Sequence, residues 1–200
     1  MKRHLNRFVS ICLISFFFQP SSVNGQEVVN FDISVAGISI GEMSAIKTTT
    51  GNEIKYQINS LVSFWFFGKI SVDYKSNTIY KNKQLYSAIS STNSKRGDFS
   101  SSIQWNKDHY KVDAKTYKFE NNSPIKKPFF FSSAMLFFEE PKMVKEFLAE
   151  NFGLPSPVTK VKDYYEVDVN GHKNRYYYIG GKLDKAIIYN PVKNYMIKRK

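Results

Sequence analysis

The chain has 200 residues, with 29 Lys and Arg against 17 Asp and Glu, which gives a formal net charge of +12. Its one cysteine, Cys12, lies inside an N-terminal apolar run. The remainder therefore has no disulfide and no cysteine-based metal site, and residues 26–200 are enough for one domain with its own core.

Residues 1–25 are predicted to be a signal peptide that is cleaved before Gln26. An eleven-residue apolar run, residues 8–18, is preceded by three basic residues and followed by a small-residue pattern at 23–25: Lys2, Arg3 and Arg7, then VNG. A membrane-spanning helix needs about 20 apolar residues, so the run is too short to be an anchor. We expect an exported protein, periplasmic or extracellular, with no transmembrane segment in the mature chain.

The position of Cys12 argues against lipid attachment. A lipid-accepting cysteine follows a small residue at the end of the apolar run, whereas Ile11 precedes Cys12 and further apolar residues follow it. The mature protein is therefore expected to be soluble and not a lipoprotein. The leader holds three of the 29 basic residues and none of the acids, so residues 26–200 keep a net charge of +9.

From Glu27 onward apolar and polar residues alternate, with Val29, Phe31 and Ile33 on one side, which is typical of a half-buried strand. Similar runs recur about every ten residues, separated by turn residues, near 38–40, 54–58, 70–74, 79–86, 99–105, 110–119, 165–169, 176–178, 183–189 and 195–197. The strongest hairpin signal is Asn170-Gly171. This spacing predicts a mainly β single domain: a roughly ten-stranded antiparallel meander, curled into an open or closed barrel because a flat sheet exposes its edges.

One short helical insertion is expected around residues 132–152. Ser132 or Ser133 is a suitable N-cap, and Pro141 suits the first turn of a helix. The apolar face of that helix consists of Val144, Phe147 and Leu148. Negative charge favours a helix N-terminus, so the pair Glu139-Glu140 is interpreted as helix capping and not as acid–base chemistry.

Consecutive aromatic residues are the most suggestive candidates for a binding site. In a strand they place rings on both faces, so one set covers the core and the other needs a cover, a cavity or a partner. Either the helical insertion covers the outer rings, or they line an apolar pocket in the barrel mouth. The candidate ligand-binding residues are Phe64, Trp65, Phe66, Phe67, Phe129, Phe130 and Phe131.

Catalytic motifs and cofactor signatures are missing from the sequence. The two histidines after the leader, His109 and His172, both fall in predicted turns and have no nucleophile motif nearby. No phosphate-binding glycine loop, dinucleotide fingerprint or metal-ligand spacing is present. We therefore expect no enzyme activity, no catalytic residues, no metal and no cofactor.

The positive charge is spread over many turns, which is typical of a solvated surface. Lysine and arginine do alternate with tyrosine near residues 173–178, a pattern that can stack single-stranded nucleic acid. An exported protein rarely meets nucleic acid, so an anionic envelope surface is the better candidate partner.

The whole mature chain resembles a family of exported bacterial β-rich proteins of unknown function. The resemblance rests on residues 35–41 (VAGISIG), 136–141 (LFFEEP) and 171–183 (GHKNRYYYIGGKL). At the level of the fold alone it is also similar to curved-sheet periplasmic carrier domains. The resemblance implies no catalytic residues.

The leading hypothesis is a non-enzymatic envelope protein that binds an apolar or lipid-like ligand, or an envelope partner, through aromatic residues of a curved sheet. One alternative is a periplasmic hydrolase or carbohydrate-active enzyme assembled from distant strands, with His109 and His172 as its best candidates. Another is a purely structural component of envelope assembly.

Overall fold

A computed structural model describes residues 24–65, 69–95, 97–116, 118–189 and 193–200. Of the predicted signal peptide only Asn24 and Gly25 fall within these ranges. Both belong to the first strand, where they pair with Thr50 and Thr49. No helix in the described ranges is long and apolar enough to cross a membrane.

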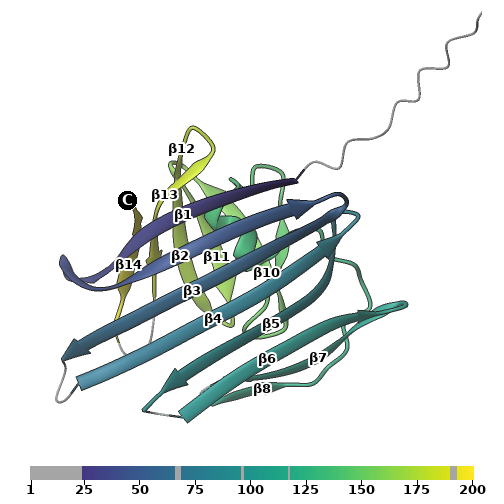
Figure 1. Cartoon of the computed structure of the whole chain (residues 1–200), viewed down its shortest axis with the longest axis horizontal. Coiled ribbons are helices and arrows are strands. Elements are labelled where there is room, and N and C mark those ends of the chain that lie inside the picture. Colours follow the sequence, from purple (N-terminus) through teal and green to yellow (C-terminus); the bar gives the residue numbers. More distant parts are fainter. Residues whose placement is uncertain (1–23, 66–68, 96, 117, 190–192) are drawn as a thin grey trace, which may run out of the picture.

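Strands make up most of the described chain (Figure 1). The first eight are joined as successive hairpins: β1 (Asn24–Val35), β2 (Ile38–Thr50), β3 (Glu53–Trp65), β4 (Lys69–Lys81), β5 (Gln84–Ser94), β6 (Gly97–Asn106), β7 (His109–Thr116) and β8 (Phe119–Asn121). A connection containing one 3₁₀ turn, η1 (Ser133–Phe137), leads to the last six: β9 (Glu146–Ala149), β10 (Leu154–Val161), β11 (Tyr164–Val169), β12 (His172–Ile179), β13 (Lys182–Ile188) and β14 (Tyr195–Arg199).

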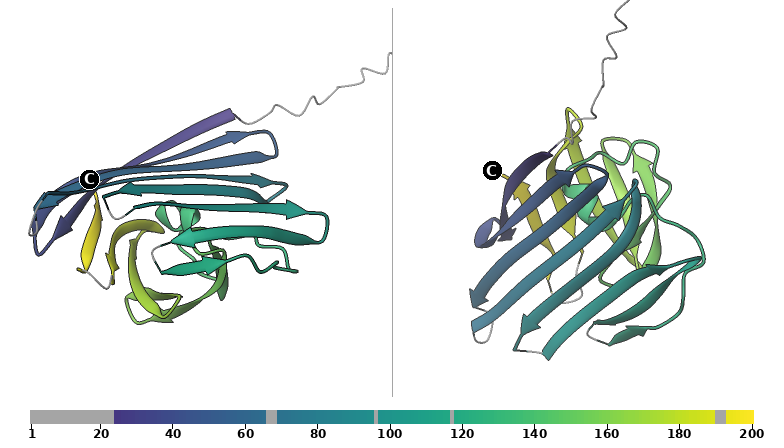
Figure 2. Two further views of the ribbon diagram at one scale, coloured as in Figure 1. Left: turned by 90° about the horizontal axis from the view of Figure 1, so that it is seen from below. Right: turned by 45° about the vertical axis from the view of Figure 1, so that its right-hand side comes forward.

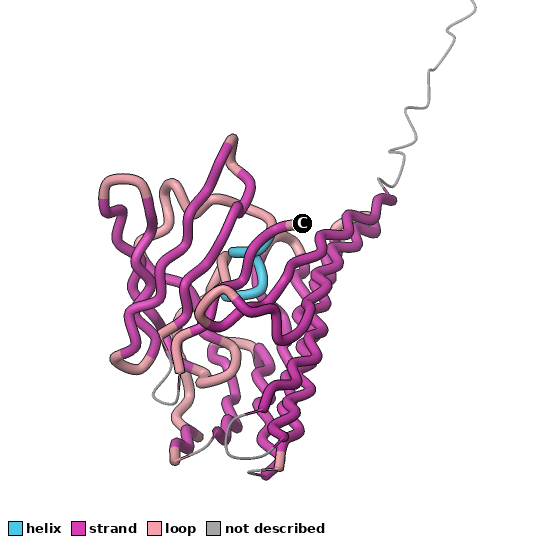
Figure 3. Tube along the Cα trace, turned by 90° about the vertical axis from the view of Figure 1, so that its left-hand side faces the viewer, coloured by secondary structure: helices cyan, strands magenta, loops and turns pink. Residues whose placement is uncertain are grey.

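All fourteen strands form one antiparallel sheet in the order β8-β7-β6-β5-β4-β3-β2-β1-β14-β13-β12-β11-β10-β9. The last strand thus pairs with the first, with Ile33 of β1 opposite Ile197 of β14. The sheet curls so strongly that β9–β14 lie over the same face as β3–β7 (Figure 2). The 3₁₀ turn, cyan in Figure 3, lies between the two halves of this curl.

The period-two pattern sets the inner face of the sheet. Val29, Phe31 and Ile33 are buried, as their alternation predicts. One row of directly opposed inner residues is dominated by small side chains: Ala45, Ile58, Ser76, Ser90, Ser101 and Ala114. Small side chains let a second layer of chain come close to the sheet, and the loop after β9 uses this space.

The expected number of strands, roughly ten, was too low. The stretch 110–119 is two strands, β7 and β8, and the polar residues after Ala88 continue β5 to Ser94. Strand β10 was missed because it contains Pro155 and Pro157, which weaken a strand signal. Both prolines pair with β9, on the outermost pair of the sheet, where proline is tolerated.

The expected helix over residues 132–152 is also wrong. Only the five-residue turn η1 is helical, and Phe147 and Leu148 belong to strand β9. Phe147, Leu148 and Ala149 are all buried. A strand that is covered on both faces has consecutive apolar residues and no alternation. The spacing of Val144, Phe147 and Leu148 therefore fits such a strand as well as it fits one face of a helix.

The sheet does not close into a hydrogen-bonded barrel. Its terminal strands, β8 and β9, are not paired with each other in the part of the chain that the structure describes. The connection between them bonds instead to both sides of the gap: Ile125 pairs with Tyr110 of β7, and Ser132 pairs with Leu148 of β9. The fold is therefore an open, barrel-like sheet whose seam is covered by its own chain.

The tight pairing of β2 with β3 gives a first prediction. A Cβ on Gly41 would lie 2.2 Å from the carbonyl oxygen of Leu61, which is backbone and cannot swing away. We expect Gly41→Ala to lower the free energy of unfolding by about 3 kcal/mol, the upper part of the range for overpacking. Gly51→Ala is the control: Gly51 has φ +57° with no atom within 4 Å, so it should cost only about 1 kcal/mol. Equal losses in urea unfolding would contradict the close approach.

Candidate functional site

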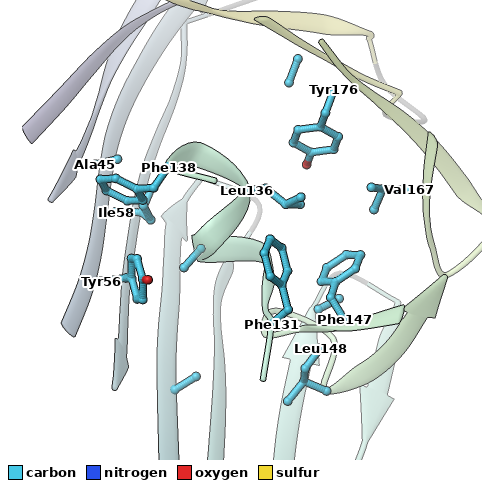
Figure 4. Close-up of a cluster of buried hydrophobic side chains, with 14 of the residues drawn as sticks. Ala45, Tyr56, Ile58, Phe131, Leu136, Phe138, Phe147, Leu148, Val167 and Tyr176 are labelled. Carbon is cyan, nitrogen blue, oxygen red and sulfur yellow. The ribbon is translucent and has the colours of Figure 1, made fainter. Parts of the chain in front are cut away.

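The connection between β8 and β9, residues 122–145, gives the sheet its inner layer, and we call it the strap. It bonds first to β7 and then enters the concave side through η1, before it reaches β9. Its side chains meet both halves of the curled sheet (Figure 4). The strap therefore contributes residues both to the core and to the surface of the fold.

The first part of the strap is held by Tyr110. The backbone N–H of Tyr110 donates to the Ile125 carbonyl at 2.8 Å. Its buried hydroxyl donates to the Leu85 carbonyl at 2.8 Å and accepts from the N–H of Phe129 at 3.1 Å. The N–H of Leu85 donates in turn to the Phe129 carbonyl. Burial raises the pKa of Tyr110, so the hydroxyl stays a donor near neutral pH.

The 3₁₀ turn is held by Glu150, the residue directly after β9, whose side chain is buried with 3% of its surface exposed. Its Oε1 accepts hydrogen bonds from Thr78 Oγ1 of β4 at 3.1 Å and from the N–H of Ala134 at 3.2 Å. Its Oε2 accepts a short hydrogen bond from the Ser133 hydroxyl. The Glu150 carbonyl accepts from Ser101 Oγ of β6 at 2.5 Å. One residue thus ties the strap to β4, β6 and β9.

This buried carboxylate also affects its neighbours electrostatically. Burial is the largest cause of the raised pKa of Tyr74 and of Tyr80, and the negative charge of Glu150 is the second. Tyr74 donates to Oδ1 of Asn151, the next residue along, at 2.9 Å. The phenols around Glu150 therefore stay neutral over the whole physiological range.

The end of the strap is held by the pair Glu139-Glu140. Glu139 Oε1 lies 2.7 Å from Lys47 Nζ and accepts from the Tyr56 hydroxyl at 3.4 Å. Glu140 Oε1 accepts from the Tyr165 hydroxyl at 2.9 Å. The two carboxylates bond to opposite halves of the sheet, so their interpretation as helix capping is wrong and their role is to fasten the strap.

Apolar side chains fill the space between these polar fastenings. Phe138 stacks at a tilt on Tyr56, with ring centroids 5.4 Å apart, and Phe137 meets Phe31 edge to face at 5.7 Å. On the other side Leu136 and Phe131 point towards the half that carries Val167 and Phe147 (Figure 4). The strap residues that point inwards thus form part of the core.

The structure separates the predicted aromatic site residues. Phe129 and Phe131 are buried in the core, whereas Phe130 between them is 60% exposed. Phe64 and Trp65 end β3, where the backbone pairs with Ile70 and Lys69 of β4; Phe66 and Phe67 lie outside the described residues. Trp65 is opposite Lys69 at the start of β4, whereas Leu85, which bonds to Phe129, is opposite Tyr80 near its end. The two positions are thus about eleven residues apart along β4, or roughly 36 Å at the usual rise of a strand.

The outer side of the strap combines an exposed ring with positive charge. The exposed Lys126 and Lys127 precede Phe130 by four and three residues; Lys127 pairs with Glu146, and its Nζ lies 5.1 Å from the ring centre of Phe129. Two neighbouring turns each carry a further lysine: Lys83 precedes Leu85, and Lys107 lies close to Tyr110. We call Lys83, Lys107, Lys126 and Phe130 the strap face.

The other candidates do not come together. His109 Nδ1 lies 2.7 Å from Asp108 Oδ1 on one exposed hairpin, and His172 begins β12 on another. Two surface hollows of about 310 and 370 Å³ are lined mainly by outward-facing polar residues of β1–β6 such as Asn59 and Asp73. Within the described ranges, no group of three His, Cys, Asp or Glu side chains is placed to hold a metal ion. The strap region therefore presents exposed side chains for contact with a partner, and not a cluster of catalytic or metal-binding groups.

Comparison with known proteins places the fold but assigns no activity. A family model described as "Domain of unknown function (DUF6134)" matches residues 31–200. The fold is similar to the crystal structure of a beta-barrel-like protein of domain of unknown function DUF1849 from Brucella abortus, at 10% identity with a TM-score of 0.53. That match covers 90% of this chain and 97% of the other. No curated protein matches the chain.

The fastening by Glu150 gives a second prediction. Glu150→Gln keeps the shape but removes the charge that receives three hydrogen bonds, so we expect a loss of about 1.5–3 kcal/mol in the free energy of unfolding. Glu146→Gln is the matched control, because its ion pair with Lys127 is exposed and should contribute less than about 1 kcal/mol. The measurement is urea unfolding at neutral pH. Similar losses in the two variants would show that Glu150 does not fasten the strap.

A third prediction concerns alkaline pH. Burial, and then the hydrogen bond and charge of Glu140, raise the pKa of Tyr165 from 10.0 to about 12. The neutral phenol therefore stabilises the folded state fully below pH 10, and that stability is lost as the pH rises towards 12. We expect the free energy of unfolding to fall with pH above 10 most steeply in the unaltered protein, less in Glu140→Gln and least in Tyr165→Phe. Equal slopes would contradict the assignment.

Proposed function

This chain belongs to the family described as Domain of unknown function (DUF6134), and we propose that it is a non-enzymatic protein of the cell envelope that binds an anionic, lipid-like surface through its strap face. The observation that carries the proposal is Phe130, whose ring is exposed in the middle of the segment that fastens the fold. Its neighbours Phe129 and Phe131 point inwards, so the strap cannot turn Phe130 inwards without losing core contacts.

The lysines of the strap face supply the matching charge. Lys126 is exposed, and Lys83 and Lys107 lie in turns with φ of +67° and +62°, a backbone region that costs a residue with a side chain roughly 1 kcal/mol compared with glycine. Glycine or asparagine would adopt these turn conformations at a lower cost. The lysines at these two positions are therefore not explained by the shape of the turns. An exposed aromatic ring with lysines on the same segment and on neighbouring turns is a combination that favours the interface of a membrane with anionic headgroups.

The filled interior supports a surface site over an internal one. An apolar ligand inside the curl would have to displace Phe131, Leu136 and Phe138, together with the hydrogen bonds of Glu150. The strap already occupies the place that a ligand takes in a small barrel. The aromatic end of β3, with Phe64 and Trp65, remains a second proposed contact for a lipid-like molecule.

Sedimentation with lipid vesicles tests the proposal. The protein should bind vesicles of phosphatidylcholine mixed with phosphatidylglycerol and not vesicles of phosphatidylcholine alone, and added salt should weaken binding. Burial of one phenylalanine ring is worth about 1.5–3 kcal/mol, so Phe130→Ser should lower the partition coefficient about tenfold or more. Lys126→Glu should lower it about fivefold or more, since a lysine near such a surface contributes about 1 kcal/mol and the new acid is repelled.

Two control variants make the same kinds of substitution at positions outside the strap face. Ile179→Ser removes another exposed apolar side chain, at the end of β12, and Lys198→Glu reverses an exposed charge on β14. Both should bind vesicles nearly as well as the unaltered protein. Failure of the unaltered protein to bind anionic vesicles, or equal effects of Phe130→Ser and Ile179→Ser, would overturn the proposal.

A further inference from the structure

A second group of aromatic and basic residues lies on the outer side of β11–β13, on strands that carry none of the strap-face residues. Tyr164 and Tyr177 are directly opposed across β11 and β12, with ring centroids 5.4 Å apart. Arg175 is two positions before Tyr177, and its guanidinium carbon lies 5.0 Å from the ring centre of Tyr164 and 5.4 Å from that of Tyr189. Lys185 Nζ lies 4.9 Å from the ring centre of Tyr177.

Strand alternation directs this group away from the core. The neighbours Tyr165 and Tyr176 are buried on the inner face, so Tyr164, Arg175 and Tyr177 point outwards and are half-exposed. Lys185 is opposite Tyr177 in the next strand. The group is therefore continuous across three strands and accessible from solvent.

The charge of Arg175 is not neutralised by an acid of the protein. Glu166 is directly opposite Arg175, yet its carboxylate pairs with Lys173 Nζ at 3.3 Å. Arg175 and Lys185 form no ion pair among the described residues, and the Nε of Arg175 is buried without a hydrogen-bond partner there. Buried donors without an acceptor are uncommon, but Nη1 of Arg199 shares this feature. What distinguishes Arg175 is a charge that no acid in the described part of the chain neutralises, held between the rings of Tyr164 and Tyr189.

We propose that Arg175, Lys185 and the rings of Tyr164, Tyr177 and Tyr189 form a binding site for an oxyanion, either a carboxylate of an acidic sugar or a phosphate group. The two flanking rings limit the rotation of the guanidinium, so its planar fork is already positioned for the two oxygens of such a group. Lys185 adds a second positive charge, and the tyrosine hydroxyls can donate further hydrogen bonds. This site is independent of vesicle binding through the strap face.

Packing without a ligand is the competing explanation. Cations over aromatic rings also stabilise the exposed face of a sheet, and cross-strand pairs of this kind need no ligand. The two explanations differ in what an added oxyanion does. If Arg175 only packs against the rings, the NMR signals of its N–H groups do not change; if it binds the oxyanion, they shift.

The test follows the Nε–Hε resonance of Arg175 by NMR while two probes are added separately, inorganic phosphate and polygalacturonate. A saturable shift with phosphate alone assigns a phosphate ligand, and one with polygalacturonate alone assigns an acidic sugar; a response to both supports a general oxyanion site. Arg175→Gln should lower the affinity measured by calorimetry at least tenfold. Arg175→Lys should also lower it severalfold, because the charge remains but the fork is lost.

Arg199→Gln is the matched control, since Arg199 is another half-buried arginine with a nitrogen that lacks a partner among the described residues. It should leave the affinity unchanged. Circular dichroism of each variant shows whether the sheet is intact, and the resonance of the unaltered protein gives an answer even if a variant does not fold. Absence of any response to both probes, or equal losses in Arg175→Gln and Arg199→Gln, would overturn the proposal.

Discussion

The carboxylate of Glu150 lies where the strap, the end of β9 and the inner face of β4 meet, and its hydrogen bonds join all three. Among the described residues it is the one charged side chain that is fully buried. An unpaired carboxylate in that position would be costly, but hydroxyls of Thr78 and Ser133 and the N–H of Ala134 satisfy it. Because these donors come from two different parts of the chain, the carboxylate is satisfied only when the strap is in place.

The dependence of the fold on the strap follows from the shape of the sheet. A curled sheet that is not closed leaves two edges and a concave apolar face, and each needs a cover. Here the edges are short, three residues in β8 and four in β9. The strap bonds to Tyr110 on one side and Leu148 on the other while it fills the concave face with Leu136 and Phe138. One segment thus meets both requirements in a chain without disulfides.

The alternation of single strands was readable from the sequence, and the role of the strap was not. Val29, Phe31 and Ile33 predict their own burial because a strand has a fixed period of two. Glu139 and Glu140 gave the wrong structure because their partners, Lys47 and Tyr165, are brought near only by the curl of the sheet. A local pattern contains no information about such contacts.

Glu150 was missed altogether. It follows three buried residues whose spacing predicted a helix, so the sequence did not predict the end of a strand there. The one signal in the sequence was an acid directly after the apolar run that ends at Ala149, followed by Asn151 and Gly153. Likewise, the sequence predicts Phe129, Phe130 and Phe131 as one group, but the ring that faces outwards is decided by distant partners: Leu85 and Tyr110 bond to Phe129, and Leu148 bonds to Phe131.

The outer surface of the sheet is not uniform in charge. One row of directly opposed residues crosses ten strands, from β11 to β6: Tyr164, Tyr177, Lys185, Lys198, Asp32, Glu42, Leu61, Asp73, Asn93 and Asp98. The charged side chains of this row are basic up to β14 and acidic from β1 onward. Part of the acidic stretch is neutralised within the protein, since Asp73 pairs with Lys75 and Glu42 pairs with Lys200. The two parts of the sheet therefore differ in the charge that they present to solvent: it is positive on β13 and β14, and negative but partly neutralised on β1–β6.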